Sequence, residues 1–525
     1  MRMNFLIIIP NLKRIILFLF CIVLFSDCKK IMHEEETSIG KITNYEQLVS
    51  ATDGVYGRLA DVINSYDFYY ANVKGDDLTF NPTIYTDYYN PGRDCYKNNI
   101  FYSIYPNVWS LTYKVLASTN NIVTQFNLSS VNDKKTKEIL GEVYFLRAYC
   151  YFRLTRTYGE IPIINSIDIN YVVPKSSFIK IYKFIENDLI LAKSLLPLNN
   201  NNSRIPNVTP HRGTAKALLS ELYLSWAGYP IKDISKYTLA AKEASETIDS
   251  SSYFGFGLVN DFAYLWDSTY FYNPESVFTI FFSKPSDNPS DLSLLNNLYI
   301  GSISNIGFIT APGMPLVNLY FPPTEVNFFN SYPAGYRKDI TFFNNIYVPY
   351  DSEIKRDTGY FHITHISNCN RIGYRKIFYQ PYLLSKYPQY YGNHKVYILR
   401  YAQTLLTYAE AMSRSGNLNA HALECVNQIR RRSHHLDLNS PSVFDLQPGL
   451  SSEAFNDSVV WERAWELCGE PEGRWFDLVR LEMVENLPKI RDPKEGGPPN
   501  VFDKSVYYFT IPSIDTLFDP NLRMK

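Results

Sequence analysis

The chain has few of the cysteines that disulfide and zinc frameworks require. It contains seven in 525 residues, of which one lies in the first 27 residues and another is Cys28. The others are Cys95, Cys150, Cys369, Cys425 and Cys468. This leaves an odd number and no Cys-x-x-Cys pair, so neither a disulfide framework nor a zinc ribbon is indicated. Cys150 and Cys425 lie on apolar faces of predicted helices, and we expect them in the core.

The chain also lacks an excess of either charge. Lys and Arg total 51, against 52 Asp and Glu. No net field would therefore attract nucleic acid or an anionic membrane surface. We expect no nucleic-acid partner.

No apolar run near the N-terminus is long enough to span a bilayer. Ile15 to Phe25 is an unbroken run of 11 residues, whereas a spanning helix needs roughly 20. Lys13 and Arg14 precede it and Ser26-Asp27-Cys28 follow, a pattern typical of an export signal over residues 1–27. The Cys28 position resembles a lipobox, which predicts a lipid-modified cysteine as the first mature residue. The alternative is a plain signal peptide with Cys28 unmodified.

Catalytic motifs are absent from the sequence. It contains no G-x-S-x-G, H-E-x-x-H, P-loop or G-x-G-x-x-G. His434 and His435 are adjacent and would point apart on a helix, which makes them a poor metal pair. We therefore expect no catalytic residue, no metal and no cofactor.

Two glutamates nevertheless need an explanation. Glu462 and Glu466 are one turn apart on a predicted helix, close in sequence to Arg474 and Arg480. Paired carboxylates could act in glycoside hydrolysis if they faced each other across an open cleft. Their spacing on one helix favours instead a structural ion-pair network with these two arginines.

What the chain has in abundance is aromatic residues, chiefly tyrosine. They make up 16% of the residues, with 43 Tyr, 33 Phe and only 6 Trp. Many lie in segments with a helical apolar period interrupted by Gly, Pro or Asn. Four such segments predict antiparallel helix pairs: 43–63 with 109–126, 141–164 with 178–198, 214–248, and 400–433. Residues 66–108 and about 255–395 show little helical period and are expected to be irregular loops.

The segment GEVYFLRAYCYFRLTRTYGEIPII, residues 141–164, carries three arginines. Arg147, Arg153 and Arg156 could contact a ligand or a partner. The alternative is that their guanidinium groups stack on aromatic rings and pair with carboxylates of neighbouring helices. We favour this scaffold role, with Gly159 to Pro162 ending the helix.

Five segments together resemble the SusD/RagB family of nutrient-uptake outer-membrane lipoproteins. They are residues 141–164, TPHRGTAKALLSELYLSWAG, YILRYAQTLLTYAEAMSRSGN, VVWERAWELCGEPEGRWFDLVRLEMVE and YYFTIPSIDTLFDPNLRMK. The departures from the family pattern are Gly141 for Ala, Gln403 for Glu, the inserted Pro471-Glu472, Asp519 for Asn, and Arg523-Met524 for Gln-Asn. The resemblance spans the chain from Cys28 to the C-terminus, except for the middle loops.

The resemblance implies a mostly α fold of four tetratricopeptide-like helix pairs, on which irregular loops build a binding face. The parts would be a helical N-terminal part of about 28–250, a loop-rich middle of about 255–395 and a helical C-terminal part of about 396–525. It further implies a cell-surface protein, lipid-anchored in the outer membrane, that binds a nutrient oligosaccharide, catalyses no reaction and serves a SusC-like TonB-dependent transporter. There are two alternatives to oligosaccharide binding without catalysis. One is that a protein of the same architecture binds a peptide, and the other is that it hydrolyses a glycan.

The aromatic loops are the expected ligand-binding residues. Sugars present flat C–H faces edged by hydroxyls, which suit exposed rings beside amide, carboxylate or guanidinium groups. The candidates are Tyr85, Tyr88, Tyr89, Asn90, Arg93 and Tyr96 in the N-terminal loop, and Trp266, Tyr299, Tyr320, Tyr336 and Arg337 in the middle region. The alternative is that these rings simply pack against the scaffold. Just ahead of the first loop, Asp76-Asp77 predicts a turn or helix cap rather than a cation site.

Overall fold

The computed structural model describes most of the two helical parts and a smaller share of the loops. The described residues are 40–64, 74–79, 107–165, 173–267, 270–282, 324–343, 373–374, 376, 394–493, 504–512, 515–516 and 519–523. Those from Thr43 onward form one compact unit. The predicted signal peptide, Cys28, Cys95 and Cys369 lie outside the described residues.

Four helix pairs form where the apolar period and its breakers predict them. Their bounds are α2 (Tyr45–Asn64) with α6 (Asn107–Thr124), α7 (Lys134–Tyr158) with α8 (Phe178–Leu195), α9 (Arg212–Ala227) with α10 (Lys236–Asp249), and α16 (Tyr401–Arg414) with α17 (Ala420–Ser433). The members of each pair contact each other. The prediction of a mostly α fold with tetratricopeptide-like pairs is confirmed.

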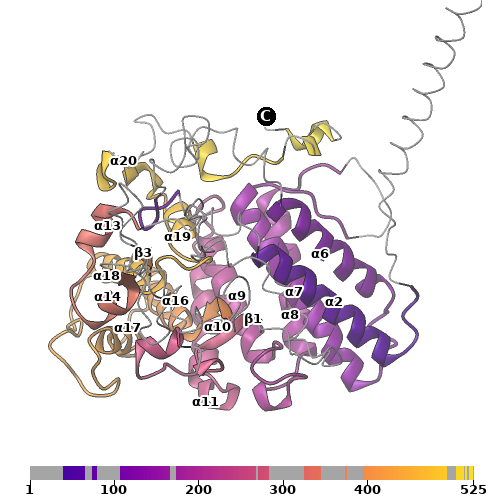
Figure 1. The fold of residues 1–525 in the computed structure, drawn as a ribbon, viewed down its shortest axis with the longest axis horizontal. Helices are drawn as coiled ribbons and strands as arrows, with labels where there is room; N and C mark the ends of the chain where they lie inside the picture. The colour runs from indigo at the N-terminus through magenta and orange to yellow at the C-terminus, as the bar shows by residue number, and fades with distance from the viewer. Residues whose placement is uncertain are drawn as a thin grey trace, which may run out of the picture. The chain divides into compact units, whose positions relative to one another are not determined.

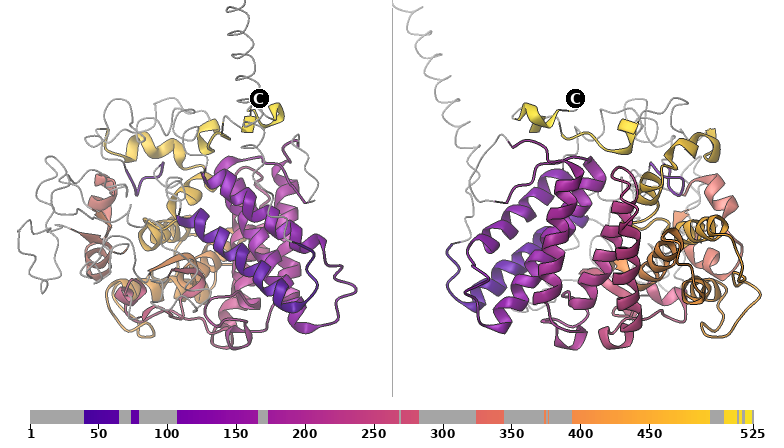
Figure 2. Two further views of the ribbon diagram at one scale, coloured as in Figure 1. Left: turned by 45° about the vertical axis from the view of Figure 1, so that its right-hand side comes forward. Right: turned by 180° about the vertical axis from the view of Figure 1, so that it is seen from behind.

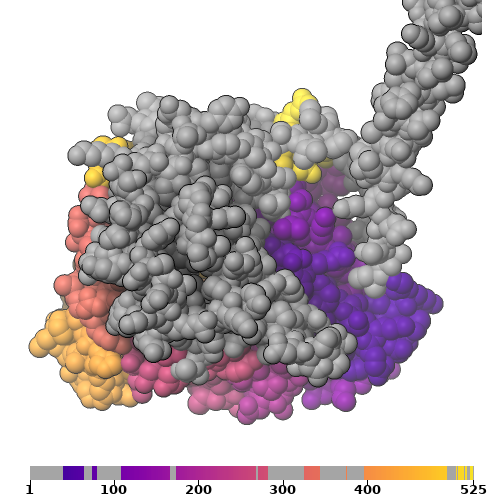
Figure 3. Space-filling model, in the orientation of Figure 1, coloured from indigo at the N-terminus to yellow at the C-terminus, as the bar shows by residue number. Residues whose placement is uncertain are grey.

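The pairs stack in chain order. Beyond the contacts within pairs, α6 packs on α7, α8 on α9, and α10 on α16, which also contacts α18 (Ser452–Leu467). Figure 1 shows the result: α2, α6, α7 and α8 lie together on one side and α16, α17 and α18 on the other, with α9 and α10 between them. The view from behind shows the same order (Figure 2). In the space-filling view α2, in indigo, lies at the surface (Figure 3).

Helix α7 is defined by local signals at both ends and is buried between them. Asp133 is the N-cap, and its side chain accepts a hydrogen bond from the Thr136 amide. Gly159 ends the helix at φ 80°, a left-handed conformation that favours glycine. Almost every residue from Ile139 to Tyr158 is buried, including Arg147 and Arg153. Such buried charges require partners inside the fold.

The glycine at position 141 is explained by helix packing. A Cβ at this position would lie 3.0 Å from the Leu196 amide nitrogen and 3.1 Å from the Leu195 side chain. Helix α7 therefore approaches the end of α8 more closely than an alanine would allow without a local shift. This close approach accounts for the glycine where the family pattern has alanine.

Two short sheets were not predicted. Strand β1 (Ser276–Phe282) pairs antiparallel with β4 (His394–Arg400), and β2 (Phe342–Phe343) with β3 (Gly373–Tyr374). An isolated bridge joins Leu78 to Thr324. The expectation of irregular loops over 255–395 is therefore wrong for these strands.

Several short helices complete the described fold. They are α11 (Ser251–Phe254), α13 (Val326–Ser331), α14 (Tyr336–Thr341), α19 (Arg474–Arg480) and α20 (Leu487–Ile490), with 3-10 turns at Asn200–Asn202, Phe262–Leu265 (η2), Val484–Asn486, Lys504–Tyr507 and Pro520–Leu522. Within the described ranges, none of the helices combines the length and apolar character needed to cross a membrane.

Candidate functional site

Two of the predicted ligand residues meet on one aromatic surface. Trp266 directly follows η2, and Tyr336 begins α14. Together with Tyr264 they are partly buried and pack against a small core cluster of Val259, Phe262, Leu265 and Tyr397. We call Tyr264, Trp266 and Tyr336, with Tyr270 described below, the aromatic surface. The structure thus brings together side chains that are 70 residues apart in the sequence.

Trp266 is held by rings and cations. Its ring lies edge-on to Tyr397, with centroids 5.6 Å apart at 90°, and the Lys376 Nζ lies 5.1 Å from its centroid. The indole N–H has no hydrogen-bond partner among the described residues. Because this N–H is buried, a partner for it would be an ordered water.

Tyr336 is fixed at both ends of its side chain. Its hydroxyl donates to the Asp261 carboxylate, which also accepts a hydrogen bond from the Ala263 amide at the start of η2. Its ring lies 4.4 Å from the His435 ring, centroid to centroid. This bracing links α14 to η2, so the two segments present their rings as a unit.

The structure adds aromatic residues that the sequence reading did not select. Tyr264 and Tyr270 stack face to face, with ring centroids 3.9 Å apart and planes inclined by 14°. Tyr270 and Tyr272 are each 41% exposed. Three tyrosines within nine residues beside Trp266 were the available signal, since exposed rings in a loop are the feature that predicts sugar contact.

Lys395 supports this segment from beneath. Its ammonium group donates hydrogen bonds to the main-chain oxygens of Tyr270, at 2.7 Å, and Phe271, at 3.2 Å. Burial lowers the pKa of Lys395 to about 7. Asn273 and Leu265 both hydrogen-bond the Tyr397 hydroxyl, at 2.7 and 2.9 Å. The exposed tyrosines therefore stand on a braced main chain, a preorganised arrangement that lowers the entropy cost of binding.

Arg337 is placed differently from the other candidates. It is 3% exposed, and its Nη1 donates to Glu462 at 2.6 Å and to Glu466 at 2.9 Å. Its buried position does not favour direct contact with a ligand. The remaining candidates, namely Tyr85, Tyr88, Tyr89, Asn90, Arg93, Tyr96, Tyr299 and Tyr320, lie outside the described residues.

Arg337 belongs to a buried ion-pair network. Its members, all 9% exposed or less, are Glu275, Arg337, Lys376, Arg400, Arg432, Glu462, Glu466 and Glu470. Four cations thus face four carboxylates. Because the carboxylates are occupied by cations and buried, they are not arranged for acid–base chemistry in an open cleft.

The network confirms the structural role of Glu462 and Glu466 but corrects their partners. Arg474 pairs instead with Asp76, at 2.7 and 2.8 Å. Arg480 pairs with Glu410 and Asp477. Asp76 lies in a turn segment, as predicted, and its carboxylate is fully buried in this pair.

The three arginines of α7 have the scaffold role that the sequence favours. Arg147 pairs with Asp188 of α8 at 2.8 Å. Arg153 and Arg156 both pair with Glu472, and both stack over the Phe476 ring. Glu472, which interrupts the family pattern, is therefore the partner of this conspicuous helix.

The cysteine and metal expectations can be compared with the described residues. Cys150 and Cys425 are buried, as predicted, and so is Cys468. Over the described ranges, no group of three or more His, Cys, Asp or Glu side chains is arranged to hold a metal ion.

The chain matches two family descriptions in separate regions. Residues 31–224 match a family described as starch-binding and associating with the outer membrane, and residues 342–513 match the SusD family. SusD-like protein P2 of Formosa agariphila is 24% identical over 441 residues, which cover 79% of this chain and 78% of that protein.

Solved structures show the same fold. A SusD homologue from Bacteroides thetaiotaomicron has a TM-score of 0.74 at 22% identity, covering 94% of this chain and 98% of that chain. The surface glycan-binding protein A of the same species, in complex with laminarihexaose, has a TM-score of 0.68 at 18% identity, covering 92% and 99%. The fold is therefore that of a SusD-like protein. The chain belongs to the SusD/RagB family.

Proposed function

We propose that this protein binds a nutrient oligosaccharide at the bacterial cell surface. The observation that carries the proposal is the aromatic surface, in which the partly buried rings of Tyr264, Trp266 and Tyr336 and the exposed ring of Tyr270 stand on a braced main chain. Flat rings stack on the C–H faces of sugars, and tyrosine hydroxyls exchange hydrogen bonds with sugar hydroxyls. The relative bound to laminarihexaose supports the same class of ligand.

The proposal includes binding without catalysis and delivery to a partner. The bound glycan would pass intact to a SusC-like TonB-dependent transporter of the outer membrane, as the family resemblance implies. Copurification of such a transporter with the full-length chain from outer membranes tests the partnership. Release of shortened products from the bound glycan would contradict the non-catalytic part.

The aromatic surface is tested with the double variant Tyr264→Ala/Tyr270→Ala. We expect an oligosaccharide panel to identify a glycan that binds the wild type, and the variant to bind it about tenfold more weakly. The reason is that truncating an aromatic contact costs about 1–2 kcal/mol, and about 1.4 kcal/mol corresponds to a factor of ten in affinity. Isothermal titration calorimetry measures both affinities.

Tyr253→Ala is the matched control, because Tyr253 is 52% exposed on α11 and is not part of the aromatic surface. It should bind as the wild type does. Equal affinity of the double variant and the wild type would reject this surface, and heat from peptides where no glycan gives any would favour a peptide ligand.

We further propose that Cys28 carries the lipid anchor. The Cys28→Ala variant should then lose acylation and appear outside the membrane fraction, because one lost anchor removes the apolar chains that hold the protein to the bilayer. Fatty-acid labelling and membrane fractionation measure this, with Cys21→Ala in the apolar part of the signal as the control. A Cys28→Ala protein that stays labelled and membrane-bound would refute the assignment.

A further inference from the structure

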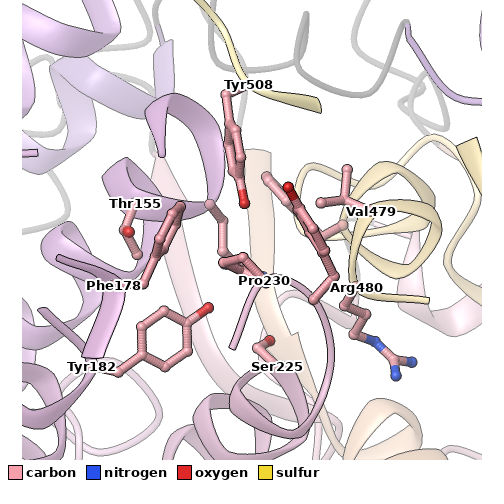
Figure 4. Close-up of a pocket in the computed structure, with 11 residues that line it drawn as sticks. Thr155, Phe178, Tyr182, Ser225, Pro230, Val479, Arg480 and Tyr508 are labelled. Carbon is pink, nitrogen blue, oxygen red and sulfur yellow. The ribbon is translucent and has the colours of Figure 1, made fainter. Parts of the chain in front are cut away.

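A pocket lies in the helical scaffold, apart from the aromatic surface. The elements that line it contribute no residue to that surface. It is formed where the end of α7, the start of α8, the end of α9 and α19 meet the segment around Tyr508 (Figure 4). Its empty volume is about 300 Å³, most of which belongs to the open mouth. Its enclosed part has room for only one or two water-sized groups.

Buried hydroxyl groups point into this space. Tyr182 of α8 is 3% exposed and Ser225 of α9 is 8% exposed, and both line the pocket. In Figure 4 both hydroxyls, and that of Tyr508, point toward the space beside Pro230. Burial raises the pKa of Tyr182 to about 12, so its hydroxyl remains a donor at neutral pH. Hydroxyls that point into a pocket can hydrogen-bond an occupant of that pocket.

Aromatic rings form the walls and the mouth. Phe178 and Tyr508 lie with centroids 5.5 Å apart at 38°, and Tyr229 is held from behind by Tyr507, 5.1 Å away. The position of Tyr508 depends on Gly159, because a Cβ there would lie 3.2 Å from the tyrosine ring. These faces offer apolar contact to a carbon skeleton.

The pocket carries no uncompensated charge on its described walls. Arg156 is paired with Glu472, and Arg480 with Glu410 and Asp477. A charged ligand would therefore find no opposite charge to neutralise it, and its desolvation would be unfavourable. The chemistry of the walls selects a neutral ligand with hydroxyl groups and an apolar face.

We propose that this pocket is a second ligand site that takes the vicinal diol of a neutral polyhydroxyl compound. Two adjacent hydroxyls match the one or two water-sized positions and hydrogen-bond Tyr182 and Ser225, while the attached carbons lie against Phe178 and Tyr508. The diol could belong to a sugar residue of a glycan or to a small free polyol, which share this chemistry. The site does not depend on the proposed function, because it uses other elements of the fold.

The test removes one hydroxyl at a time without changing the shape of the pocket. Tyr182→Phe and Ser225→Ala are compared with the wild type by ligand-observed saturation-transfer NMR, using glycerol and methyl α-D-glucopyranoside as probes. Each variant should weaken binding of a probe about five- to tenfold, as expected for one lost hydrogen bond. Tyr253→Phe, which removes an exposed hydroxyl elsewhere, should leave the affinity unchanged.

The outcomes are separable. If both probes bind and both variants weaken them, a sugar residue is supported, whereas glycerol alone with the same variant effects supports a small polyol. If no probe binds up to about 0.1 M, or if neither variant changes the affinity, the pocket holds only water and the proposal is overturned. The Tyr264→Ala/Tyr270→Ala variant should bind these probes normally, so a failure of the aromatic surface would be seen independently.

Discussion

Replacing Glu466 with glutamine is expected to lower the free energy of unfolding by about 3–5 kcal/mol. Glu466 is fully buried, and its carboxylate accepts hydrogen bonds from Arg432 at 2.7 Å, Arg400 at 2.8 Å and Arg337 at 2.9 Å. Burial alone would raise the pKa of Glu466, but the three arginines outweigh it and hold the pKa far below its usual range. The glutamine keeps the size of the side chain but removes its charge and replaces one acceptor oxygen with a donor, leaving the buried arginines without a full set of partners.

Denaturant-induced unfolding, followed by tryptophan fluorescence, measures this loss. Glu453→Gln is the matched control, because Glu453 lies exposed in the first turn of the same helix, α18. Its charge lies at the N-terminal, positive end of the helix dipole, so its removal should cost about 0.3–1 kcal/mol. If the two variants lose stability equally, the buried network does not stabilise the fold as its geometry implies.

The helix pairs could be predicted because their signals are local. In the pair α16–α17 the apolar period, Gly416 at φ 75° and the N-cap Asn419, which accepts a hydrogen bond from the Ala422 amide, lie within one short segment. Strands β1 and β4 offer no such local signal. Ser276 pairs with Arg400, and the apolar runs of both strands lie at the borders of segments rich in Tyr, Asn and Pro.

The sequence could predict that Glu462 and Glu466 form ion pairs, but not which cations they pair with. The spacing of Glu462 and Glu466 shows that they share a helix face, but it does not show which distant segment covers that face. That segment is α14, which brings Arg337, a residue that the sequence reading selected as a ligand contact. Arg474 likewise finds Asp76, 398 residues away. Long-range pairing is set by the stacking of the helices, which no local spacing determines.

In the candidate site, too, some features could be predicted from local sequence and others depend on long-range packing. Trp266 and Tyr336 could be selected from the sequence because aromatic residues in loops predict sugar contact. The stacking of Tyr264 on Tyr270, and the convergence of Tyr182 with Ser225, depend on how separate elements meet. Sequence alone therefore indicates the kind of site, and the packing decides which rings and hydroxyls form it.

Replacing Asp77 is the second substitution with a large expected effect on the free energy of unfolding. It should raise this free energy, whereas replacing Glu466 should lower it. The side chain is fully buried, with Oδ2 accepting a hydrogen bond from the Gly469 amide at 2.9 Å and Oδ1 without a partner among the described residues. Burial, with a smaller contribution from Asp76, raises the pKa of Asp77 from 3.8 to about 7. Other titratable groups near it are Arg474, Cys468 and Tyr374.

This pKa shift makes the contribution of Asp77 to the stability of the wild type fall as the pH rises. Between about pH 4 and pH 7 the unfolded chain has released the Asp77 proton while the folded protein still holds it. At this site the unfolded state then binds fewer protons, so the contribution of Asp77 to the free energy of unfolding decreases with pH and levels off above about pH 7. A shift of about three pKa units sets an upper limit of roughly 4 kcal/mol for this penalty at pH 8.

The Asp77→Asn variant should therefore be more stable than the wild type at pH 8, by about 1–3 kcal/mol, and equally stable near pH 4. Its amide oxygen keeps the hydrogen bond from Gly469, and it carries no charge to bury. Unfolding in urea at a series of pH values measures the difference. Asp76→Asn is the contrasting control, since it leaves Arg474 buried without its partner and should destabilise the protein at every pH. A difference between Asp77→Asn and the wild type that is constant with pH would show that Asp77 does not titrate in this range.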